Sequence, residues 1–281
     1  MKLILSTSNT MSGGPSVIRR PFFEKSNTEL TSSLRENFAA HQPTPAPSKL
    51  DYTTWTTKTD SALYIPTHTP SPLTEPRESY DITVKLFYLP NIPADRRCAQ
   101  TREAIELVLK ELGTSSIDLL INTTGDCLDA GVPPEDIETM ITTWRTLEKL
   151  QLEGLVSKLG IAEFGVARLT RFLEHTKIKP SVNQINVRDC CVVPKPLILY
   201  AKQQQIELLT HNDCTNILPR GTLRQILGSG ENGSGVLAGE GNEDGLKGDV
   251  EPQWVVKYTA VVKDRGVVES KGYFAVAELR D

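Results

Sequence analysis

The chain lacks the features that would direct it to a membrane or to nucleic acid. It has no apolar run approaching the roughly 18 residues of a transmembrane helix. Its formal net charge of −4 gives no general attraction to nucleic acid or to an anionic membrane surface. The apolar residues 3–5 are too short for a secretory signal and are followed by polar residues. We therefore expect a cytoplasmic protein whose first apolar segment is a buried strand.

Cysteine patterns suited to metal or redox chemistry are also missing. The five cysteines are an odd number without the spacing of a disulfide framework, and there is neither a Cys-x-x-Cys motif nor a His–Cys cluster suited to zinc. Reduced thiols are expected in the cytosol. We interpret the adjacent Cys190 and Cys191 as packing residues at a strand end, because a disulfide between neighbours needs a strained ring. No metal site is predicted.

Two stretches of biased composition interrupt the chain. Residues 26–80 are rich in Ser, Thr and Pro, and the repeated prolines remove backbone donors and break helices. This stretch is expected to be largely loop, with one or two helical turns over residues 32–40. Residues 228–249 are rich in glycine, whose ordering costs entropy, so they are expected to form a flexible surface insertion.

Between these stretches, strand and helix patterns alternate. Strands are predicted at residues 82–88, 117–122, 158–162, 182–186 and 207–210, and helices at residues 95–112, 133–153, 166–176, 196–205 and 221–227. The strand runs are largely apolar, as parallel strands buried on both faces require. Right-handed crossovers would join them into an α/β fold. The end of the chain is expected to finish with a strand or with a helix followed by a strand.

Four segments resemble the aldo-keto reductases in order and spacing. They are ITVKLF at 82–87, SSIDLLINTT at 115–124, VSKLGIAEF at 156–164 and PSVNQINV at 180–187. The resemblance implies a (β/α)8 TIM-type barrel. Because 281 residues can bury one sizeable core, we expect a single barrel domain over residues 1–281, carrying the two biased stretches as insertions.

A closer resemblance is to a non-enzymatic branch of that superfamily, the regulatory (modifier) subunits of glutamate–cysteine ligase. VNQINVRDCCVVPKPLILYAKQQQIELLTHND at 182–213 and KDRGVVESKGYFAVAEL at 263–279 are similar to segments of that family. The two insertions suggest a fungal-type member. The resemblance implies a heterodimer with the catalytic subunit, which becomes more efficient and less sensitive to feedback inhibition by glutathione. No ligase chemistry is expected, because no phosphate-binding loop or Mg-ATP carboxylate cluster is present.

The residues for carbonyl reduction are incomplete. Aldo-keto reductases use a tyrosine as proton donor, a lysine that lowers its pKa, a supporting aspartate and a histidine that orients the carbonyl. Lys85 falls in the lysine's place, either as a relic or weak anion site or as a lysine paired with Asp81 or Asp118. Tyr64 follows Asp60 at a spacing of four where the family has five. Lys85 and Tyr64 are therefore only vestigial catalytic candidates.

The histidine's place is taken by Asn122 or Thr123, neither of which has an ionisable imidazole. The sequence His211, Asn212, Asp213 follows the strand at 207–210. It is compatible with a catalytic His–Asp pair. We favour the alternative in which Asn212 and Asp213 cap the next turn and the histidine is hydrogen-bonded inside the barrel mouth.

The cofactor positions are also depleted. Asn183 and Gln184 match positions that contact the nicotinamide carboxamide in the reductases, and they are the vestigial cofactor-binding candidates. The Ser-Asn pair of the family is replaced by Ala162 and Glu163, an aromatic is replaced by His211, and the Ile-Pro-Lys-Ser segment has no counterpart. No bound cofactor is predicted. An NADPH-dependent aldo-keto reductase stays as the alternative to the regulatory subunit.

Overall fold

The fold is taken from a computed structural model that describes most of the chain. The described residues are 1–12, 25–43, 51–89, 92–123, 134–186, 192–214, 216–230, 232–240 and 242–280. The interpretation of Cys190 and Cys191 lies outside these ranges.

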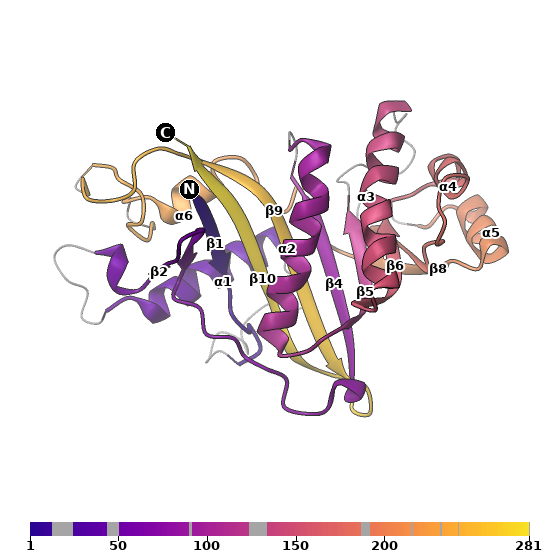
Figure 1. The fold of residues 1–281 in the computed structure, drawn as a ribbon, viewed down its shortest axis with the longest axis horizontal. Helices are drawn as coiled ribbons and strands as arrows, with labels where there is room; N and C mark the ends of the chain where they lie inside the picture. The colour runs from indigo at the N-terminus through magenta and orange to yellow at the C-terminus, as the bar shows by residue number, and fades with distance from the viewer. Residues whose placement is uncertain are drawn as a thin grey trace.

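Five parallel strands form one half of the sheet. The helices after the first four of these strands pack against one face of the sheet, whereas the helix after the fifth belongs to the core on the other face (Figure 1). The strands are β4 (Tyr80–Tyr88), β5 (Ile117–Thr123), β6 (Val156–Ala162), β7 (Val182–Asn186) and β8 (Glu207–His211). The helices are α2 (Ala94–Leu112), α3 (Pro134–Leu152), α4 (Val166–Leu173), α5 (Lys195–Gln204) and α6 (Thr222–Leu227). All five predicted strands are confirmed, with bounds shifted by two residues at most.

The other half of the sheet is built by the two ends of the chain. It contains β1 (Lys2–Ser6), β2 (Thr57–Lys58), β3 (Ala62–Ile65), β9 (Asp249–Val262) and β10 (Val267–Arg280). The long hairpin β9–β10 lies between β1 and β4, and β9 pairs antiparallel to the whole length of β4 (Figure 1). The chain therefore ends in two strands.

The α/β class and the aldo-keto reductase-like run of parallel strands are confirmed, but closure into a (β/α)8 ring is not seen in the described part of the chain. There the ten strands follow the order β2-β3-β1-β10-β9-β4-β5-β6-β7-β8, so β2 and β8 are the two edges of a sheet. The reason is that β9 occupies the side of β4 on which a closed parallel barrel would place its preceding strand.

The stretch expected to be largely loop contains a long helix. Helix α1 runs over Ser26–His41, where Leu30, Leu34 and Phe38 recur every four residues and are buried against the sheet. The same stretch also contains β2, β3 and two short 3-10 helices, η2 (Tyr52–Thr54) and η3 (Arg77–Ser79). The prolines of this stretch all follow α1 and do not interrupt it, so the periodic apolar pattern indicates the helix correctly.

The glycine-rich stretch packs closely where the structure describes it. Val236 and Leu237 are buried in the core beneath α1 and α6. A Cβ at Gly245 would lie 2.5 Å from the carbonyl carbon of Leu237, whereas a Cβ at Gly230 would meet nothing within 4 Å. Glycine at position 245 is therefore required by a close approach of two backbone segments.

This packing predicts unequal responses of two glycines to alanine. Gly245→Ala is expected to lower the free energy of unfolding by about 1–3 kcal/mol, because the new methyl group collides with backbone atoms. Gly230→Ala is the matched control and is expected to change it by less than about 0.5 kcal/mol. Urea denaturation of the two variants measures the difference. Equal values would show that this stretch is a loose insertion.

Helices α2 and α3 cover one face of the sheet and bury its main core. Trp144 and Phe172, from α3 and α4, meet edge to face with ring centroids 5.2 Å apart. Both side chains, and that of Leu147, are only 1% exposed. These apolar helix faces therefore pack inward, as their periodicity predicts, and are not available to a partner. No helix among the described residues is long and apolar enough to cross a membrane.

Candidate functional site

The sheet face opposite α2 and α3 carries two lysines side by side. Val84 and Leu86 of β4 point into the core beneath those helices, so Lys85 between them points to the other face. Lys257 of β9 is the register partner of Lys85 and shares that face. Like charges directly opposite each other on a sheet repel, so this pair needs a counter-charge.

Asp213 provides that counter-charge from the turn after β8. Its Oδ2 lies 2.9 Å from Nζ of Lys85, and its Oδ1 lies 2.9 Å from Nζ of Lys257. Nζ of Lys85 also donates to Oε1 of Gln184, at 3.0 Å. The side chains of Lys85 and Asp213 are only 5% and 6% exposed. One carboxylate therefore bridges two ammonium groups in a largely water-excluded site.

Burial and charge pull the pKa values of this cluster in opposite directions. For Lys85, burial lowers the pKa below its ordinary value, and attraction to Asp213 only partly opposes that effect. For Asp213, burial alone would raise the pKa, but Lys85 and Lys257 outweigh it and hold that pKa well below its ordinary range. Asp213 is therefore a carboxylate that is ionised because two cations surround it.

A second polar contact joins the ends of β6 and β8. The backbone N–H of Asp213 donates to Nδ1 of His211 over 3.1 Å, so the ring proton sits on Nε2. Nε2 then donates to Oε1 of Glu163 over 2.6 Å, and the same oxygen accepts the backbone N–H of Asn186. The histidine is hydrogen-bonded at the mouth of the strands, as we favoured. The carboxylate of Asp213, however, pairs with lysines instead of capping a turn.

Neither of the two partners considered for Lys85 contacts it. Asp81 lies 3.6 Å from Lys263, and Asp118 lies 2.8 Å from Arg77. Sequence reasoning did not pair Asp213 with Lys85, because the two residues are 128 positions apart along the chain. The signal that would have found it is topological: the carboxyl ends of parallel strands gather at one edge of a sheet.

Tyr64 is not brought to Lys85. It belongs to β3, four strands away from β4 in the sheet, or about 19 Å at about 4.8 Å per strand. It also packs against the core beneath α2, which is the opposite face from Lys85. Asp60 is exposed. The described residues thus place no tyrosine hydroxyl within hydrogen-bonding distance of Lys85.

The two residues considered for the histidine's place, Asn122 and Thr123, lie on opposite faces of the sheet. Asn122 is in register with Leu86, on the helix-covered face, and Thr123 is in register with Phe87, on the face of Lys85. Both side chains are buried, and neither Oδ1 of Asn122 nor Oγ1 of Thr123 has a hydrogen-bond partner among the described residues. Neither group is a proton donor of the imidazole type.

The two cofactor candidates point to opposite faces of β7. Asn183 is fully buried, and its amide donates to the carbonyl of Phe164 at 2.8 Å and accepts from the N–H of Phe164 at 3.4 Å. Gln184 points to Lys85. Both ends of the Asn183 amide are already used within the chain, so the pair does not fit a nicotinamide carboxamide. Within the described ranges, no group of three or more His, Cys, Asp or Glu side chains is arranged to hold a metal.

Comparison with known proteins agrees with this arrangement. Residues 69–221 match the aldo/keto reductase family, and the chain belongs to that family. It is 30% identical over 209 residues to the glutamate–cysteine ligase regulatory subunit of Mus musculus, a match that covers 73% of this chain and 68% of the mouse protein. The chain is thus a member of the glutamate–cysteine ligase regulatory subunits within that family.

Two further relatives separate this branch from the reductases. The putative glutamate–cysteine ligase regulatory subunit of Schizosaccharomyces pombe is 27% identical over 227 residues, covering 73% of each chain. The NADPH-dependent D-xylose reductase of Candida boidinii is 32% identical over only 108 residues, covering 33% of each chain. Similarity to the two regulatory subunits therefore extends further along the chain than similarity to this reductase.

Proposed function

We propose that this chain is a regulatory subunit that binds the catalytic subunit of glutamate–cysteine ligase in a cytoplasmic heterodimer. It would raise the activity of that subunit in the first step of glutathione synthesis and relieve its feedback inhibition. The chain itself would carry out no carbonyl reduction. The observation that supports this most is the similarity to regulatory subunits over 73% of the chain.

The geometry around Lys85 supports the loss of reductase chemistry. In a reductase the lysine lowers the pKa of a tyrosine that gives its proton to the carbonyl. Here the ammonium group of Lys85 is engaged by Asp213 and Gln184, and Tyr64 lies on the other face of the sheet. A lysine held in this way stabilises the joined ends of the strands, and the part of the chain that the structure describes brings no tyrosine hydroxyl to it as a proton donor.

Regulation of this kind needs only a difference in affinity. A subunit that binds the active conformation of its partner more tightly than the inhibited one shifts the partner's population toward activity. A tenfold difference in affinity corresponds to about 1.4 kcal/mol, which an interface of ordinary size supplies easily. No reacting group on this chain is required.

Co-expression with a tagged ligase catalytic subunit tests the proposal. The two chains are expected to co-purify, and the complex is expected to have a higher kcat/KM and a higher inhibition constant for glutathione than the catalytic subunit alone. An active aldo-keto reductase used in place of this chain is the control. Failure to co-purify, or a complex with unchanged kinetics, would contradict the proposal.

The alternative activity needs its own measurement. The purified chain is expected to show no aldehyde-dependent oxidation of NADPH, and Lys85→Met and Tyr64→Phe are expected to leave that baseline unchanged. Turnover by the unchanged protein that disappears in either variant would establish a reductase. It would overturn the proposal that the chain carries out no carbonyl reduction.

A further inference from the structure

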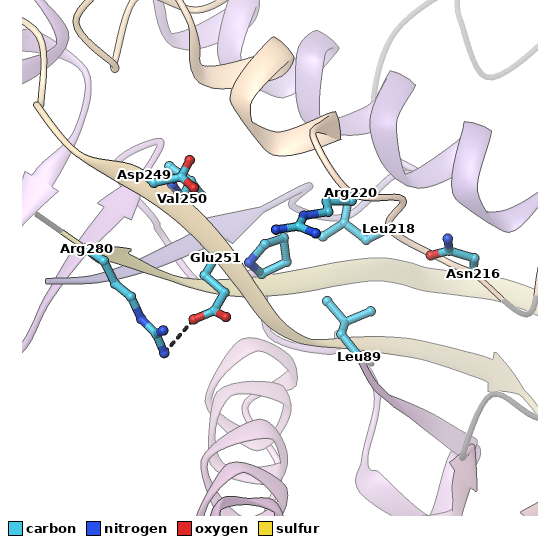
Figure 2. Close-up of a pocket in the computed structure, with 9 residues that line it drawn as sticks. Leu89, Asn216, Leu218, Arg220, Asp249, Val250, Glu251 and Arg280 are labelled. Carbon is cyan, nitrogen blue, oxygen red and sulfur yellow. Dashed lines mark hydrogen bonds and ion pairs between the residues drawn. The ribbon is translucent and has the colours of Figure 1, made fainter. Parts of the chain in front are cut away.

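A pocket of about 290 Å³ lies away from the Lys85 cluster, at the base of the β9–β10 hairpin (Figure 2). One wall is formed by the start of β9 and the end of β10, and the opposite wall by residues 216–220 between β8 and α6. Ligand pockets span roughly 300–1,000 Å³, so this one is at the small end. It would hold a molecule of amino-acid size and not a dinucleotide.

The floor of the pocket is apolar. Leu89, Leu218 and Val250 line it and are 5%, 3% and 9% exposed, and Pro252 lies beside them. The pairing of β9 with β10 shifts register between the pairs Val276–Trp254 and Ala277–Pro252, which is a β-bulge or a similar irregularity. Such bulges re-aim side chains, and this one is next to the residues of β9 that line the pocket. The floor would favour an aliphatic group.

Most charges at the rim are already neutralised within the chain. Arg280 lies 2.5 Å from Oε2 of Glu251 and 3.3 Å from Glu278. Asp249 lies 2.9 Å from Arg224. Glu251 lines the pocket, and its Oε1 makes no hydrogen bond to any described residue.

Arg220 is the exception. Its guanidinium group forms no hydrogen bond or ion pair with any described residue, and it acts on Asp249 only by longer-range attraction. Figure 2 shows Arg220 and Asn216 on the segment 216–220, with Leu218 between them, and Glu251 on β9. The guanidinium fork matches a carboxylate, with which it forms two parallel hydrogen bonds.

We propose that this pocket binds a small zwitterion, an amino acid with an aliphatic side chain. Its carboxylate would lie on Arg220, its ammonium group would face Glu251, and its side chain would cover Leu89 and Leu218. Asp249 and Glu251 at the rim disfavour a multiply charged anion such as phosphate, because like charges repel. This ligand site is separate from the regulatory role proposed above and does not depend on it.

Isothermal titration of the purified full chain tests the site with four probes of related shape. They are L-leucine, 4-methylpentanoate without the ammonium group, 3-methylbutylamine without the carboxylate, and inorganic phosphate. L-leucine is expected to bind with a Kd on the order of 1 mM, the affinity of a weak small-ligand site. Each probe that lacks one charge is expected to bind about tenfold more weakly, and phosphate not at all.

Arg220→Gln is expected to weaken the binding of L-leucine about tenfold or more. Arg171→Gln, at an exposed position on α4, is the matched control and is expected to bind like the unchanged protein. L-leucine binding that is absent, that is matched by phosphate, or that is unaffected by Arg220→Gln would overturn the proposal. Because no ligase is present in the titration, the result is independent of the proposed regulatory function.

Discussion

Asp213→Asn is expected to lower the free energy of unfolding by about 3–5 kcal/mol at pH 7, because it leaves two lysines without their shared counter-charge. Asparagine keeps the size of the side chain, so the loss is mainly electrostatic. Lys85 has the larger part in it, since its side chain is only 5% exposed and that of Lys257 is 20% exposed. Urea denaturation followed by circular dichroism measures the change.

Two further variants separate this effect from a general sensitivity to charge removal. Asp81→Asn removes a carboxylate from an exposed pair with Lys263, and it is expected to cost less than about 1 kcal/mol. Combining Asp213→Asn with Lys85→Met removes both members of the buried pair, so the double variant is expected to be more stable than the sum of the single changes predicts. Strict additivity would show that Asp213 and Lys85 do not act together.

The pH dependence follows from the lowered pKa of Asp213. A carboxylate with a lowered pKa contributes stability that is fully present above the ordinary aspartate value of about 3.9, and that is lost as the pH falls toward the folded-state pKa. The stability difference between the unchanged protein and Asp213→Asn is therefore expected to shrink below about pH 4. For Lys85, whose pKa is lowered by burial, stability instead rises with pH between its folded and ordinary pKa values. Urea titrations at pH 3 and pH 7 check the acid side.

The parallel half of the fold could be predicted from local sequence, whereas the other half could not. Each strand from β4 to β8 is an apolar run followed by a helical pattern, and this information lies within single βαβ units, the longest of which spans residues 117–162. The pairing of β9 with β4 depends on residues such as Lys85 and Lys257, which are far apart in the chain. The pattern in each segment indicates a strand but not which strand becomes its neighbour.

At the candidate site, too, the sequence indicates which residues lie on a strand but rarely which residues they contact on other strands. The contact of Lys85 with Gln184 and the spacing of Tyr64 are informative. Lys85 and Gln184 were found because each matches a family position on its own strand, and they are in contact. Tyr64 follows Asp60 by four residues where the family has five. Shifting a strand residue by one position turns its side chain to the other face, and Tyr64 does lie on the face opposite Lys85. The altered spacing was therefore a stronger signal than the matching residue types.

Trp144→Ala is expected to lower the free energy of unfolding by about 3–5 kcal/mol, the usual cost of removing a large buried aromatic side chain. Trp144 is 1% exposed, meets Phe172 edge to face, and donates from its indole nitrogen to the carbonyl of Ile178 over 2.9 Å. The substitution therefore leaves a cavity between α3 and α4 and also an unsatisfied carbonyl. Leu152→Ala, at the 81% exposed end of α3, is the control and should change stability by less than about 0.5 kcal/mol.

A double-mutant cycle locates the source of the loss. Phe172→Leu removes the ring that faces Trp144 while filling most of the space, so its coupling with Trp144→Ala reports the aromatic contact, which is worth about 0.5–1.5 kcal/mol. A coupling near zero, with both single variants strongly destabilised, would assign the loss to the cavity and not to the ring pair. A small effect of Trp144→Ala alone would mean that α3 is not fixed on the sheet by this residue.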